Sequence, residues 1–96
     1  MTASYLGSLP VTPDEQRFYK ELGARIAQLR KDRDLTQQEL ADDLGIAQQT
    51  FGHYEIGRLR VPLSMLPDLA ALLGESVETV LGPLIHSTKY KTRRHR

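Results

Sequence analysis

Residues 36–57 have the sequence TQQELADDLGIAQQTFGHYEIG, and this stretch decides the fold because it holds two short helices and the signals that separate them. Thr36, followed three residues later by Glu39, forms a capping-box pattern that predicts a helix start. Gly45 stands where a helix ends in the left-handed conformation, so it predicts the stop. Only two residues separate that glycine from a second, polar-rich helix predicted at residues 48–56. The two helices must therefore turn sharply against each other.

A longer helix is predicted before this pair. Thr12 can cap it, Glu15 stands at the capping-box position, and the helical period continues to about Lys31. One apolar stripe runs along this helix, formed by Phe18, Leu22, Ile26 and Leu29. The helix therefore has one face to bury.

Two further helices are predicted after the pair. Ser64 caps the first, which ends at Gly74, and Ser76 caps the second, which ends at Gly82-Pro83. No strand pattern competes with these helices. The sequence thus predicts an all-α fold in which five helices form one compact domain.

Composition excludes some classes of site and directs attention to where the charges lie. The 96 residues include no cysteine, so disulfides and thiolate metal sites are excluded. Residues 89–96 hold five of the thirteen Lys and Arg and no acid, which leaves eight bases against twelve acids, a balance of −4, in residues 1–88. Neither a secretory leader nor a run of ~18 apolar residues occurs, so we expect a soluble, cytoplasmic protein without membrane contact.

The central stretch resembles the helix-turn-helix of the Xre/Cro/phage-repressor family. The matching features are the Thr-Gln opening, the Glu-Leu-Ala centre, the turn glycine and a Tyr-Glu-x-Gly closing at Tyr54, Glu55 and Gly57. With its flanking helices the resemblance covers about residues 17–82, and it implies a compact, lambda-repressor-like bundle that binds double-stranded DNA. We therefore expect a flexible N-terminal arm at residues 1–12, a helix-turn-helix DNA-binding domain at residues 13–82, and a linker with a basic tail at residues 83–96.

Polar side chains at the start of the third helix are the candidates for contact with bases. A B-form major groove admits one helix, and Gln pairs well with adenine, so Gln48 and Gln49 are predicted to contact base edges. His53 could donate to a guanine acceptor or a phosphate, or could simply be solvated. Gly52 either permits close approach of the helix backbone to DNA or is a tolerated cost of about 1 kcal/mol.

Contacts to the DNA backbone are predicted at four positions. The resemblance places Gln37 at the start of the second helix, where the helix amides bind a phosphate, and places Arg58 and Arg60 in a loop that approaches the sugar-phosphate backbone. Thr50 could contact a phosphate or a thymine methyl, or could face solvent.

The resemblance also implies a structural role for one charged pair. An arginine at the position of Arg30 pairs in the family with a glutamate at the position of Glu55, so we expect an ion pair that ties the first helix to the third. Two residues depart from the family pattern: Ala47 replaces a Ser or Thr cap, and Glu75 replaces an apolar residue.

Family members of this kind usually pair through the fifth helix and the residues after it. An apolar run there is therefore the candidate interface of a homodimer, with Val80, Leu81, Leu84 and Ile85 as its contacts. The same residues could instead only close the monomer core. The basic tail could follow DNA or stay a solubilising end, and residues 1–12 could pack across a partner subunit.

These features favour a dimeric repressor that recognises a palindromic operator through the major groove. The alternative is an antitoxin or adaptor of a toxin–antitoxin or restriction-modification control system, which binds a protein partner as well as DNA. An enzyme is not expected, because His53, His86 and His95 are scattered and no nucleophile pattern, phosphate loop or metal-ligand set occurs. We expect no catalytic residues, no metal and no cofactor.

Overall fold

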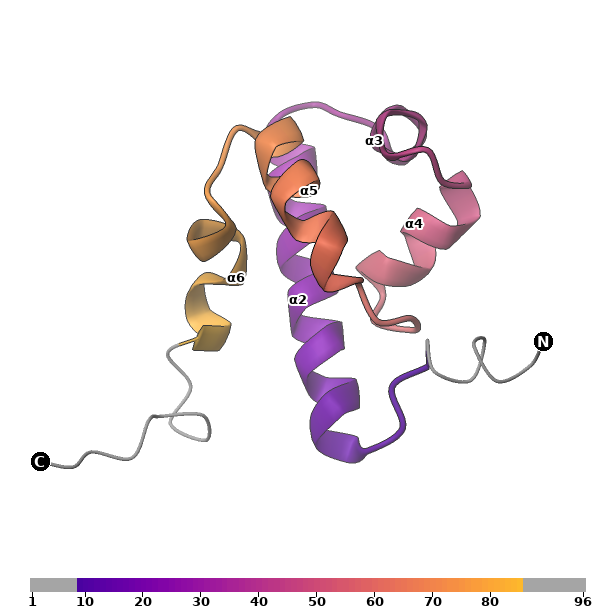
Figure 1. Cartoon of the computed structure of the whole chain (residues 1–96), viewed down its shortest axis with the longest axis vertical. Helices are drawn as coiled ribbons and strands as arrows, with labels where there is room; N and C mark the ends of the chain where they lie inside the picture. Colours follow the sequence, from indigo (N-terminus) through magenta and orange to yellow (C-terminus); the bar gives the residue numbers. More distant parts are fainter. Residues whose placement is uncertain (1–8, 86–96) are drawn as a thin grey trace, which may run out of the picture.

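The computed structural model describes residues 9–85, with the side chains of Pro83 and Ile85 excepted. Within this part of the chain there is no strand, and a 3-10 turn at Leu63–Met65 accompanies five α-helices (Figure 1), namely α2 (Pro13–Asp32), α3 (Gln37–Leu44), α4 (Gln48–Glu55), α5 (Leu66–Leu73) and α6 (Val77–Ile85). The predicted all-α bundle of five helices is confirmed.

Local capping signals set the ends of α3. The Thr36 side chain accepts a hydrogen bond from the Glu39 N–H at 3.0 Å, and the Glu39 carboxylate accepts one from the Thr36 N–H at 2.8 Å. This is the predicted capping box. At the other end, Gly45 has φ of 73°, in the left-handed region where glycine meets no Cβ penalty. These two signals fix where the turn to α4 begins.

The caps predicted at two helix starts differ in part from the structure. Thr12 caps α2, but the Glu15 carboxylate accepts from Val11 N–H, one residue earlier than a capping box requires. Ser64 caps nothing, because it lies inside the 3-10 turn and Met65 becomes the residue before α5. Gly82 interrupts the helix as predicted, because its backbone is not helical (φ 11°, ψ −99°), and a further helical stretch of α6 continues beyond this kink to Ile85.

The core forms where α2 packs between the other helices. Figure 1 shows α2 running through the middle of the molecule, with α6 on one side and the α3–α4 pair on the other. Three residues of the predicted α2 stripe are buried, whereas Phe18 is only partly buried at its edge. The fully buried side chains of largest volume come from all five helices: Leu22, Ile26, Leu40, Phe51, Leu69, Leu73 and Val80.

Two glycines bring the backbone of α2 into direct contact with the end of α4. A Cβ on Gly23 would lie 2.2 Å from the Tyr54 carbonyl oxygen and 2.5 Å from that of Glu55. A Cβ on Gly57 would lie 2.5 Å from the Cα of Lys20, and the φ of this glycine is 77°. No side chain fits between the two elements at these points. The position of α4 on the molecular surface is therefore set by backbone packing against α2.

Candidate nucleic-acid interface

The α3–turn–α4 unit occupies the side of the molecule away from α6 (Figure 1). Residues 45–47 join the two helices, and the Ile46 N–H donates to the Ala41 carbonyl at 3.0 Å, which closes the C-terminus of α3. Ala47 makes no side-chain cap bond to α4, because the methyl group of alanine cannot accept a hydrogen bond. The short linker holds α4 at an angle to α3, so the first turn of α4 projects outward.

The residues of α4 divide into a buried and an exposed set. Phe51 and Tyr54 are buried in the core, which anchors the helix. Gln48 and Gln49 are exposed at its start, whereas the other predicted contacts are half-buried, namely Thr50, Gly52 and His53. The outward surface of α4 therefore begins with two amide side chains, the groups that can match the donor and acceptor pattern of adenine.

A chain of hydrogen bonds connects the first of these amides to the interior. Gln48 Nε2 donates to Gln37 Oε1 at 2.8 Å, and Gln37 Nε2 donates to Glu55 Oε1 at 2.8 Å. Glu55 in turn accepts from Arg30, with Nε to Oε2 at 2.6 Å and Nη2 to Oε1 at 3.1 Å. The predicted ion pair is thus present and does more than join two helices, because it also orients the amides of Gln37 and Gln48.

Sequence reasoning assigned Gln37 and Gln48 separate contacts and missed the bond between them. The two residues lie 11 positions apart on different helices, and their contact depends on the angle of the turn. No local sequence signal gives that angle.

The two loop arginines have different surroundings. Arg58 is exposed after the end of α4. Arg60 instead donates to both carboxylate oxygens of Glu15, at 2.8 Å from Nε and 2.8 Å from Nη2. The structure therefore leaves the guanidinium of Arg58 at the surface and joins that of Arg60 to α2 through two N–H donors. The phosphate contacts predicted for both arginines stay predictions.

The Arg60 guanidinium lowers the pKa of Glu15 from its ordinary value of 4.5, and the Val11 N–H lowers this pKa further. Because the pKa is lower in the folded state, this carboxylate contributes stability above pH 4.5, and the contribution is lost as the pH falls through the folded-state pKa. In Glu15→Gln, the free energy of unfolding is expected to fall less steeply than in the wild type as the pH is lowered below 4.5. Urea unfolding at a series of pH values measures this. Glu21→Gln, an exposed change in the same helix, should keep the wild-type profile; a wild-type profile for Glu15→Gln would contradict the prediction.

Gly52 faces space that a methyl group can occupy. The nearest atom to an added Cβ is Gln37 Oε1 at 3.6 Å, an ordinary contact distance. Gly52→Ala is therefore expected to raise the free energy of unfolding by up to about 1 kcal/mol, the usual propensity difference in a helix. Denaturant unfolding checks this, and a loss of stability would contradict it. DNA affinity of the same variant separates the two explanations for the glycine, since only close approach of α4 to DNA predicts weaker binding.

The predicted dimer residues do not share one environment. Val80 is 0% and Leu84 7% exposed, because α6 packs these two positions against the core. Their side chains therefore close the monomer core and leave little surface for a partner, and their role as interface contacts stays a prediction. Leu81 is half-buried, and the Ile85 side chain lies outside the described residues.

Other predicted features lie partly outside the described residues. These are the basic tail at residues 89–96 and the first eight residues of the N-terminal arm. Of the described arm residues, Val11 is 66% exposed.

Glu75, noted as a departure from the family pattern, forms an ion pair with Arg33. Within residues 9–85 no group of three or more His, Asp or Glu could hold a metal ion, and none of the helices there combines the length and the hydropathy that a membrane span requires.

Comparisons with known proteins agree with this geometry. A family model described as a helix-turn-helix domain matches residues 21–81. YobD, an uncharacterised HTH-type transcriptional regulator of Bacillus subtilis (strain 168), is 43% identical over 58 residues, which are 60% of this chain and 52% of that protein. The chain thus spans about half the length of this curated relative.

Two solved structures superpose on the same part of the chain. The clp gene regulator ClgR from Corynebacterium glutamicum has a TM-score of 0.65 at 31% identity, covering 67% of this chain and 68% of that chain. SinR, a master regulator for biofilm formation crystallised in complex with DNA, has a TM-score of 0.56 at 31% identity. The match covers 62% of this chain and 97% of that chain. Since the family model matches more than half of the residues, the chain belongs to the helix-turn-helix domain family, among the Xre and lambda-repressor-like proteins.

Proposed function

We propose that this chain is a sequence-specific DNA-binding transcriptional regulator that places the first turn of α4 in the major groove. The observation that carries the proposal is the exposed pair Gln48 and Gln49, the first of which is held by hydrogen bonds that lead back to a buried ion pair. The similarity to ClgR, a gene regulator, and to SinR, which was crystallised in complex with DNA, supports the same class of activity.

The bonding of Gln48 leaves the atoms that adenine needs. An amide has two N–H donors and a carbonyl acceptor. Gln48 uses one N–H on Gln37, so its other N–H and its Oε1 remain for the N7 and N6 groups of an adenine. Gln49 makes no side-chain hydrogen bond within residues 9–85, so its whole amide is available to a second base. Because Gln37 fixes the first amide before binding, less conformational entropy is lost in the complex.

We further propose that a homodimer acts on DNA in the cytoplasm as a repressor and contacts a palindromic operator. One α4 covers only part of an operator, and helix-turn-helix dimers bind half-sites about one helical turn, or ~34 Å, apart. Val80 and Leu84 lie in the monomer core, so the half-buried Leu81 is the better placed of the described candidates on α6, and Ile85 stays a predicted contact. Binding of a dimer to the operator would exclude polymerase without any catalytic step.

Selection from a random DNA library, followed by sequencing, tests this function. The double variant Gln48→Ala/Gln49→Ala is expected to lose about 1–3 kcal/mol of discrimination for each adenine contact, and with it the enriched motif. Gln28→Ala is the matched control, because Gln28 is exposed on α2 and bonded only locally, to Asp32 at 2.8 Å. An enriched palindrome that survives in the double variant would exclude readout by these glutamines. Absence of any motif with the wild-type chain would contradict the proposed function and favour a protein partner.

A further inference from the structure

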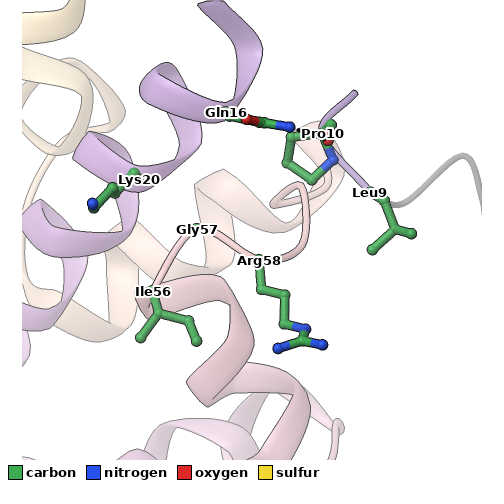
Figure 2. A pocket seen from close by; sticks show the side chains of 7 residues that line it. All are labelled: Leu9, Pro10, Gln16, Lys20, Ile56, Gly57 and Arg58. Atoms are coloured by element: carbon green, nitrogen blue, oxygen red, sulfur yellow. Dashed lines mark hydrogen bonds between the residues drawn. The ribbon is translucent and has the colours of Figure 1, made fainter. Parts of the chain in front are cut away.

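An open hollow of about 370 Å³ lies between the start of α2 and the loop after α4. Figure 2 shows the side chains around it, which are those of Leu9, Pro10, Gln16, Lys20, Ile56, Gly57 and Arg58. Two of these residues are cationic and none is acidic. The hollow therefore differs in charge from residues 1–88 as a whole, where acids outnumber bases.

Backbone packing brings the two cations to this hollow. Gly57 lies so close to α2 that a Cβ there would be 2.5 Å from the Lys20 Cα and 2.6 Å from its nitrogen. The next residue is Arg58, so the side chains of Lys20 and Arg58 leave two adjoining backbone segments (Figure 2). The fold holds these two backbone segments together without any contact between the two side chains, whose charged ends point in different directions (Figure 2).

These two cations lack the acidic partners that four of the arginines have. Within residues 9–85 neither Lys20 nor Arg58 forms a side-chain hydrogen bond or ion pair, and both are exposed. Ion pairs with acids occupy four other arginines, namely Arg17, Arg30, Arg33 and Arg60. Lys20 and Arg58 thus keep their full charge available for an external anion.

A second hollow of about 330 Å³ gives the opposite case. It lies between the end of α3 and α5, and its lining includes Asp43 and Asp68 but no base. A polyanion is repelled there and attracted by the Lys20–Arg58 hollow. Charge therefore identifies which of the two hollows can take DNA.

The position of the Lys20–Arg58 hollow relative to α4 suits the wall of the major groove. The eight residues of α4 span about 12 Å at 1.5 Å per residue, and the hollow begins at Ile56, directly after the helix. A major groove is about 12 Å wide between its phosphate strands. When Gln48 at the start of α4 contacts a base edge, the other end of the helix comes near the sugar-phosphate backbone.

We propose that this hollow binds the DNA backbone, with Lys20 from α2 as a second phosphate contact beside Arg58. The inference rests on the proposed function and extends it to a residue outside the helix-turn-helix. Ile56, 62% exposed at the edge of the hollow, offers an apolar surface to the deoxyribose next to the bound phosphate. The contact fixes the position of α4 on the duplex and carries no base preference of its own.

The salt dependence of DNA binding tests the inference. Each phosphate contact contributes about −0.9 to the slope of log K against log salt concentration, so Lys20→Gln should make the slope less negative by about 0.9. The loss should be equal on the selected site and on random DNA. Lys20→Arg should keep the wild-type slope. Arg17→Gln should also keep it, because this change removes a charge already paired with Asp14 at 2.9 Å in the same helix.

The outcomes separate this inference from the function on which it rests. A wild-type slope for Lys20→Gln, with the selected motif still bound, would reject the Lys20 contact and leave the regulator function standing. A change for Lys20→Gln that Arg17→Gln reproduces would also reject it, since net charge alone would then explain the result. Failure of the wild-type chain to select any motif would reject both.

Discussion

Gly23→Ala is expected to lower the free energy of unfolding by about 3 kcal/mol, at the upper end of the usual cost of overpacking. The added Cβ would lie 2.2 Å from the Tyr54 oxygen, 2.5 Å from the Glu55 oxygen and 2.7 Å from the Glu55 carbonyl carbon. All three atoms belong to the backbone, so no rotamer change can relieve the contact. The helix propensity gained by alanine, about 1 kcal/mol, is too small to offset it.

Chemical denaturation measures this loss, and Gly52→Ala is the matched control. Both variants replace a hydrogen of a helical glycine by a methyl group. In Gly52→Ala, however, the atom nearest to the new Cβ is 3.6 Å away. The two substitutions should therefore change stability in opposite directions. A neutral or stabilising Gly23→Ala would mean that α2 and α4 can separate without cost. Since the same backbone contact positions α4, the DNA affinity of any folded Gly23→Ala protein should also fall.

Arg30→Ala is expected to cost about 3–5 kcal/mol, because it leaves the Glu55 carboxylate buried without its cation. The side chains of the pair are 11% and 5% exposed, and they share two hydrogen bonds. Arg30 Nη1 also donates to the Leu35 carbonyl at 2.8 Å, so the loop before α3 loses a partner as well. Urea unfolding gives the loss directly.

Arg17→Ala provides the comparison within the same helix. Its partner is Asp14 at 2.9 Å, but the two side chains are 62% and 46% exposed, so the loss should stay within about 1 kcal/mol. Equal losses of stability for Arg17→Ala and Arg30→Ala would show that burial does not determine how much an ion pair contributes to the free energy of unfolding.

The double variant Arg30→Met/Glu55→Leu separates stability from recognition. Replacing both charges of a buried pair by apolar groups is often neutral, so most of the stability should return. DNA discrimination should stay weakened, because Gln37 Nε2 has lost its acceptor on Glu55 and no longer holds Gln48 in place. Full recovery of both properties would assign the ion pair a purely structural role.

The parts of the fold that could be predicted from sequence are those that neighbouring residues determine. The bounds of α3 follow from Thr36 and Gly45, whose effects act within three or four residues. The apolar period of α2 likewise predicts which of its residues are buried. The cap predicted at Ser64 was wrong because a capping residue requires an extended backbone, whereas Ser64 lies inside a 3-10 turn.

The parts that could not be predicted depend on distances across the fold. Arg60 and Glu15 are 45 positions apart, and their pairing follows only once the loop has packed on α2. Gly23 lies beside the apolar stripe and gives no local sign that another backbone approaches it. The sequence around Lys20 likewise gives no sign that the loop after α4 packs against it, since only the Gly57 contact shows this.

Under the proposed function, the hydrogen-bond chain that ends at Gln48 also governs how this protein can acquire new operators during evolution. Substitution of Gln48 removes a partner of Gln37, which is bonded to the buried Glu55, so a change of base preference there disturbs the interior. Gln49 is exposed and free of such bonds within residues 9–85, so its substitution can change specificity at little cost in stability. Related regulators that diverge in target sequence should therefore vary first at the position of Gln49 and retain the glutamine at position 48.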